Sequence, residues 1–132
     1  PYYQAITRWL DADAPLDPPT VPTVTGVEVF PPAAVLAGKG AKHRVVVRAK
    51  YSDGTDRDVT PLALFLSNND AAAKVDGDGT VTAGDRGEAF VMARFGTFTV
   101  GVPFVTLPAD AAVTWPDPPA ANYVDELVHA KL

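Results

Sequence analysis

The acidic residues of one glycine-rich stretch could bind a cation. Asp76 and Asp78 lie in the run Asp-Gly-Asp-Gly, not far from Asp70, and carboxylate oxygens gathered in this way can bind calcium. The run lacks the later bidentate acidic residue of an EF-hand loop, and Asp and Gly are also ordinary residues of hairpin turns. We therefore interpret Asp76 and Asp78 as turn residues and expect no metal site.

Nucleophilic catalysis needs a base within reach of a hydroxyl or thiol group. The chain has no cysteine, and neither of its two histidines, His43 and His129, stands near a serine in a recognised motif. The lack of cysteine also excludes disulfides, cysteine-ligated zinc and covalent haem attachment through C-x-x-C-H within this chain. The sequence thus predicts no catalytic residue and no cofactor, and it argues against an enzyme.

The charge distribution bears on the class of partner. The chain carries 11 basic and 16 acidic residues, a net charge of −5. Residues 24–107 contain nine of each sign, so the acidic excess lies in the two flanks. A phosphate-binding surface needs clustered basic residues, which no segment offers. No apolar run approaches the roughly 20 residues of a membrane span, so we expect neither a nucleic-acid partner nor a membrane span.

The strongest structural pattern lies between Lys42 and Thr60. Apolar residues alternate there with Arg44, Arg48 and Lys50, which is the period of a half-buried β-strand. A three-residue turn at 52–54 predicts a hairpin in which apolar pairs meet inside and opposite charges meet outside. The predicted cross-strand pairs are Val47 with Val59, Arg48 with Asp58, and Lys50 with Asp56.

Further strands and turns follow at similar spacing. A first strand from Val24 is interrupted by Pro31-Pro32, and 34–36 resumes pairing on another sheet. Residues 62–67 read as a central strand, and the turn at 77–79 sets Val75 opposite Val81. The two-residue turn Gly96-Thr97 predicts a hairpin with the pairs Phe95–Phe98, Ala93–Val100, Val91–Val102 and Ala89–Phe104. About seven short strands predict an all-β, immunoglobulin-like two-sheet sandwich.

This last hairpin also predicts an interaction surface. If its inward pairs are correct, Phe90 and Met92 point outward, opposite Pro103 and Gly101. Exposed apolar groups beside a glycine commonly mark a contact surface. Three interpretations stay open: docking of a flank or neighbouring domain, for example through Trp9 or Tyr123, binding of an external partner, and ordinary surface scatter. Trp9 and Trp115, in the flanks, are further candidates for such a surface.

The flanks differ in composition from the middle of the chain. Residues 2–12 have helical spacing and are followed by four prolines up to Pro22, which predict a stiff linker. A second proline-rich stretch precedes a helix that Asn122 can cap. We therefore expect three parts: 1–23, the end of a preceding domain and its linker; 24–107, the sandwich; and 108–132, a linker and the start of a following helical domain.

Two stretches carry a family resemblance. VEVFPPAAVLAGKGAKHRVVVRAKYSDGTDRDVT (27–60) and KVDGDGTVTAGDRGEAFVMARFG (74–96) resemble the bacterial immunoglobulin-like domain, group 2, of the invasin/intimin type. The sequence departs from that pattern at 64–67, where a tryptophan is usual. YYQAITRWLDADAP (2–15) resembles the end of a cytochrome c-like domain. NYVDELVHAKL (122–132) resembles the start of the domain of unknown function that follows in planctomycete-type exported proteins.

The resemblance implies a place in an extracytoplasmic parent protein, periplasmic, secreted or at the cell surface, with a haem-bearing region upstream. It implies a non-catalytic spacer and interaction module whose partners are the neighbouring domains of the same polypeptide and, at the cell surface, a protein or glycan. The alternative is a carbohydrate- or cell-wall-binding adhesion module. That alternative needs an exposed aromatic platform, for which Tyr2, Tyr3 and Trp115 are the available candidates.

Overall fold

The computed structural model of the chain describes residues 2–110, 114 and 118–131. Its strands are β1 (Val24–Phe30), β2 (Ala34–Ala37), β3 (Lys42–Arg44), β4 (Val46–Tyr51), β5 (Asp56–Asp58), β6 (Leu64–Ser67), β7 (Ala73–Val75), β8 (Thr80–Ala83), β9 (Gly87–Phe95) and β10 (Phe98–Leu107). Its helical elements are α1 (Tyr2–Asp11), the 3₁₀ helix η1 (Thr60–Leu62) and α2 (Tyr123–Lys131).

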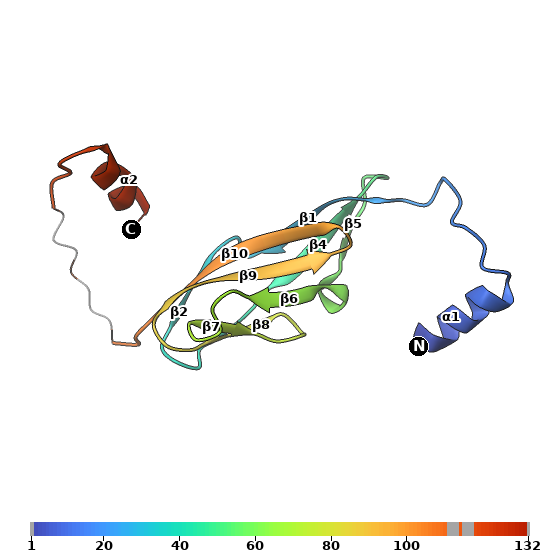
Figure 1. Ribbon diagram of the computed structural model, residues 1–132, viewed down its shortest axis with the longest axis horizontal. Helices are drawn as coiled ribbons and strands as arrows, with labels where there is room; N and C mark the ends of the chain where they lie inside the picture. Colours follow the sequence, from blue (N-terminus) through green and yellow to red (C-terminus); the bar gives the residue numbers. More distant parts are fainter. Residues whose placement is uncertain (1, 111–113, 115–117, 132) are drawn as a thin grey trace.

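The strands form an all-β, immunoglobulin-like sandwich of two layers. One layer is the sheet β2-β10-β9-β6, and the other combines β1-β4-β5 with β3-β8-β7. The predicted long strand through 44–51 is divided at Val45, whose N–H donates to the Gly79 carbonyl at 2.9 Å. Because β3 and β4 are consecutive, the two three-stranded sheets continue one another and cover the four-stranded sheet (Figure 1).

The core lies between these layers. One cluster of buried side chains collects residues from both layers: Val29, Leu36, Val45, Val47, Ala49, Val59, Ala63, Ala72, Ala73, Val81, Ala83, Ala89, Val91, Ala93, Val102 and Phe104. Alternation along each strand turns these residues inward and leaves their neighbours outward. Small residues dominate the cluster, and Phe104, with no exposed surface, is its largest fully buried side chain.

The predicted hairpin registers are confirmed. Arg48 pairs with Asp58 and Lys50 with Asp56 in the β4–β5 hairpin, and the Val59 N–H donates to the Val47 carbonyl at 2.8 Å. Val75 pairs with Val81 in the β7–β8 hairpin. All four predicted pairs of the β9–β10 hairpin are present. β2 leaves β1 after the prolines and pairs in parallel with β10, on the other layer, as predicted.

The prediction for residues 62–67 is wrong in one respect. β6 is an edge strand, hydrogen-bonded to β9 on one side, and not a central one. Leu64 and Leu66 point outward and are 70% and 62% exposed. The chain turns through η1, where Pro61 stands near the start of the helix, so Leu62 belongs to this turn and not to the strand. An apolar run alone does not distinguish a buried strand from an edge strand.

The flanking helices form where the sequence predicts them. α1 ends at Asp11, and Asp13 and Ala14 then adopt positive φ values of 66° and 48° before Pro15. Asn122 caps α2, because its Oδ1 accepts the Val124 N–H at 2.9 Å. α1 stands away from the sandwich at the end where the chain enters, and α2 follows the end where it leaves (Figure 1).

Candidate interaction surface

The outward side chains of the four-stranded sheet form a mostly apolar surface, which we call the outer face. The register arranges it in rows across the sheet. Val35, Val105 and Glu88 form one row, and the next two rows follow with Pro103 beside Phe90 and Gly101 beside Met92 and Leu66. The apolar residues of the outer face are Val35, Leu64, Leu66, Phe90, Met92, Pro103, Val105 and Leu107.

Phe90 and Met92 lie on this face in the predicted register, opposite Pro103 and Gly101. Phe90 is 42% exposed, and Met92 is partly covered. A Cβ atom added at Gly101 would lie 3.9 Å from Met92 Cγ and 4.0 Å from Phe90 Cδ1. Both side chains therefore lie next to the space that a side chain at position 101 would occupy.

The sequence did not single out the larger part of the outer face. Val35 is 64% exposed and Leu107 is 43% exposed, at the other end of the face from Leu64. Strict alternation in β10 placed the outward positions correctly, but β2 is short and residues 62–67 were predicted as a central strand. The missing information was which face of these two strands lies against the other layer, and a short or wholly apolar run does not carry it.

The two tryptophans do not add to this surface in the described part of the chain. Trp9 lies on α1, 49% exposed, and its Nε1–H donates to the Pro15 carbonyl at 2.9 Å. This bond fixes the indole against its own linker, on the opposite side of the molecule from α2 (Figure 1). Trp115 lies outside the described residues. Tyr123, suggested as a cover for Phe90, is 73% exposed.

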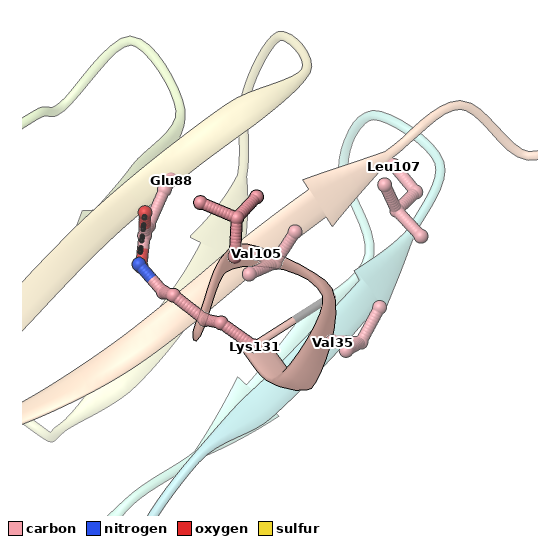
Figure 2. Close-up of a pocket in the computed structure, with 6 residues that line it drawn as sticks. Val35, Glu88, Val105, Leu107 and Lys131 are labelled. Carbon is pink, nitrogen blue, oxygen red and sulfur yellow. Dashed lines mark ion pairs between the residues drawn. The ribbon is translucent and has the colours of Figure 1, made fainter. Parts of the chain in front are cut away.

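α2 instead approaches the outer face through its other end. A groove of about 550 Å³ lies between them, lined by Val35, Glu88, Val105, Leu107, Val128 and Lys131. Lys131 Nζ lies 3.9 Å from Glu88 Oε2. Figure 2 shows Lys131 extending from the end of the helix to Glu88, beside Val105.

The opposite layer carries a charged cluster in place of an apolar face. Arg48 contacts Glu28 Oε2 through Nη2 at 2.9 Å and Asp56 Oδ2 through Nη1 at 3.0 Å, and Lys50 pairs with Glu28 as well. Hydrogen bonds from Lys50 and Arg48 hold the pKa of Glu28 below its ordinary value. The bond to Glu28 raises the pKa of Arg48. The two basic and two acidic side chains balance one another in charge, but among the described residues Arg48 Nε is buried without a hydrogen-bond partner.

These partners correct the predicted side-chain pairs. Although Arg48 is in register with Asp58, its guanidinium turns to Glu28 and Asp56, while Asp58 Oδ1 accepts the Thr60 N–H at 2.9 Å. Hydrogen bonds from Thr60 hold the pKa of Asp58 below its ordinary value. Asp58 thus closes a turn, and Glu28 takes its place because β1 lies beside β4.

The residues considered for catalysis and metal binding lie apart from one another. His43 is exposed on β3, with its ring centroid 6.4 Å from that of Phe104, and His129 lies on α2. Asp76 Oδ1 accepts the N–H groups of Asp78 and Thr80, at 3.0 and 2.8 Å, as a turn residue does. Among the described residues, no three His, Asp or Glu side chains gather as a metal site.

Comparison with known proteins identifies the fold of this chain. No protein-family model matches the sequence, and no curated protein matches it. Among solved structures, the chain is similar to domains 5–6 of the S-layer protein SbsC (TM-score 0.56, 23% identity, 70% of this chain and 48% of that chain). It is also similar to SbsC domains 4 and 5 (TM-score 0.55, 22% identity, 65% of this chain and 53% of that chain).

A longer SbsC structure, rSbsC(31-844), matches with a TM-score of 0.58 and 23% identity, over 70% of this chain and 14% of that chain. The chain thus spans about half of the two-domain structures that it matches and a small part of the longer one. None of the described helices is long and apolar enough to cross a membrane. What the likeness establishes is an immunoglobulin-like sandwich, a fold that hosts many functions.

Proposed function

We propose that this chain is a non-catalytic immunoglobulin-like spacer and interaction module of a larger cell-surface or otherwise extracytoplasmic protein. One observation carries the proposal: the chain enters the sandwich at one end and leaves it at the other (Figure 1). Val24, where β1 begins, pairs with Tyr51 beside the 52–54 turn, and Leu107, where β10 ends, pairs with Ala37 at the far end.

Connections at opposite ends of the sandwich are what a spacer domain needs. β10 is ten residues long, and a strand of that length spans about 30 Å. A domain with terminal connections at opposite ends adds that length between its neighbours, whereas one with both connections at the same end adds little. The proline-rich stretches on either side stiffen the connections, because proline fixes the backbone and favours extended conformations.

The outer surfaces favour domain contact over chemistry. The apolar outer face offers area for packing, and the charged cluster of Glu28, Arg48, Lys50 and Asp56 is neutralised within itself. The likeness to domains of an S-layer protein supports a place in a cell-surface protein. We further propose the division at 23/24 and 107/108, with flanks that belong to a cytochrome c-like domain before the sandwich and a helical domain after it.

The division is tested by limited proteolysis of the chain itself. We expect cleavage within 12–23 and 108–121 and a resistant fragment close to 24–107, because backbone held in a sheet resists cleavage and linkers do not. Rapid cleavage inside β9 or β10 while the flanks stay intact would contradict the division.

The spacer function is tested in the full-length protein by replacement of residues 24–107. An unrelated sandwich with termini at opposite ends is expected to preserve function, and one with both termini at the same end is expected to abolish it. A glycan array with the 132-residue chain gives an independent result. Specific glycan retention that Trp115→Ala abolishes would overturn the spacer in favour of the carbohydrate-binding alternative.

A further inference from the structure

We propose that one end of the outer face, formed by Val35, Val105 and Leu107, is the docking surface for α2 of the same chain. This contact holds the C-terminal joint in one orientation and leaves the N-terminal joint free. The inference rests on the proposed spacer function and adds a property to it. A module of this kind fixes the orientation of the domain that follows it and lets the domain that precedes it rotate.

The apolar part of this contact comes from Val128. It lines one groove together with Val35, Val105 and Leu107, which belong to β2 and β10. On the sheet side, Val35 is 64% exposed and Leu107 is 43% exposed even with the helix present. The groove of about 550 Å³ leaves room for the helix to settle further onto the same residues.

A charge pair orients the helix on this groove. Glu88 is an acid in the row formed with Val35 and Val105, and Lys131 Nζ lies 3.9 Å from its Oε2. Lys131 is three residues from Val128, so both side chains lie on one face of the helix. An apolar contact and a complementary charge one turn apart select a single rotation of α2 against the sheet.

Helix stability gives a reason for this contact. α2 has nine residues, and an isolated helix of that length is marginal in water. A seat on the sheet supplies the tertiary support that it needs. α1 differs, since none of the ion pairs among the described residues joins it to the sandwich. Its side-chain hydrogen bonds stay within its own segment: Thr7 bonds to Tyr3 and Gln4, and Trp9 bonds to Pro15. Figure 1 shows α1 separated from the sandwich by its linker.

The absence of cysteine makes a cross-linking test direct. The double variant Val35→Cys/Val128→Cys is treated with a short bifunctional maleimide at low protein concentration, and the intramolecular product is measured. The matched control is Val35→Cys/Ala130→Cys, because Ala130 is two residues from Val128 and lies on the far side of the helix. We expect at least about threefold more product from the first pair, since seating raises its effective concentration.

The ion pair is tested in the same background. Glu88→Lys should lower the Val35–Val128 product by about twofold to fivefold, the range of an exposed ion pair, and Lys131→Glu added to it should restore the product. All substituted positions lie outside the core cluster, so each variant is expected to unfold at the same urea midpoint as the wild type. Measurement of that midpoint verifies that the variants fold. Equal product from the two cysteine pairs would overturn the seated joint, while the domain-replacement result would decide the spacer function separately.

Discussion

The hydroxyl of Thr60 completes the hydrogen bonding of β4 where the partner strand ends. The Val47 N–H donates to Thr60 Oγ1 at 2.8 Å, and both residues are buried. β5 stops at Asp58, so β4 continues beyond its partner. A side chain takes the place of the missing strand, and it does so because Asp58 holds the Thr60 N–H in a turn.

Removal of this hydroxyl is therefore expected to destabilise the sandwich. Thr60→Val keeps the volume but leaves the Val47 N–H buried without an acceptor, a loss of about 1–3 kcal/mol in the free energy of unfolding. Thr60→Ser keeps the oxygen and should lose less. Urea unfolding of the two variants measures the difference, and a Thr60→Val protein as stable as the wild type would refute the role of the bond.

Gly79 allows a close approach between the layers. It has φ +78°, and a Cβ atom there would lie 3.0 Å from Phe65 Cζ and 3.1 Å from the Val45 carbonyl oxygen. Gly54 has the same conformation, φ +82°, with no atom within 4 Å. We expect Gly54→Ala to cost about 1 kcal/mol from backbone strain and Gly79→Ala roughly 3 kcal/mol, because overpacking is added.

Thermal unfolding of both glycine variants measures this comparison. The Gly54→Ala protein is the control, since it carries the backbone strain without the contacts. If the two variants lost the same stability, the residues around Gly79 would have to move without an energetic cost. The close packing of Phe65 and Val45 around Gly79 would then be disproved.

Two phenylalanines of the β9–β10 hairpin allow the cost of losing a buried ring to be compared with the cost of losing an exposed one. Phe104 is fully buried, whereas Phe90 is 42% exposed on the outer face. Phe104→Ala is expected to cost about 3–5 kcal/mol, the range for deletion of a core aromatic side chain. Phe90→Ala should cost less than about 1 kcal/mol. Denaturant titrations compare them, and a Phe90→Ala loss as large as that of Phe104→Ala would show that the outer face is part of the core.

Much of the fold could be predicted from local pattern, and the failures share one cause. Turn lengths fixed the register of Val91 against Val102 and of Arg48 against Asp58, because a two-residue side-chain period permits one solution per turn. Side-chain partners followed a different rule. Arg48 contacts Glu28 on β1, a strand remote in sequence, and Leu66 is exposed because it lies on the outer face of its sheet, away from the other layer. Neighbours of that kind are set by topology, which local alternation does not encode.

The same limit applies to the candidate surface. Phe90 and Met92 were identified from one hairpin, where the paired residues are close in sequence. Val35 and Val128 were not, because they come from β2 and α2, and the groove that both line depends on how distant segments meet. The absence of a metal site or catalytic group was inferred from residue types, and it stays a prediction for the chain as a whole.

Acidification is expected to weaken the sandwich through Glu28, Asp53 and Asp58. Their pKa values are lowered in the folded protein, by Lys50 and Arg48 at Glu28, by Thr55 at Asp53 and by Thr60 at Asp58. A carboxyl group whose pKa is lower in the folded than in the unfolded protein stabilises the fold at pH values above its unfolded pKa. That contribution disappears as the pH falls through the folded value.

The urea midpoint should therefore stay level from neutral pH to about pH 5 and fall below about pH 4. Glu28→Gln should flatten this fall, whereas Glu126→Gln, on α2, should not, and an equally steep fall in the Glu28→Gln protein would exclude the cluster as its source.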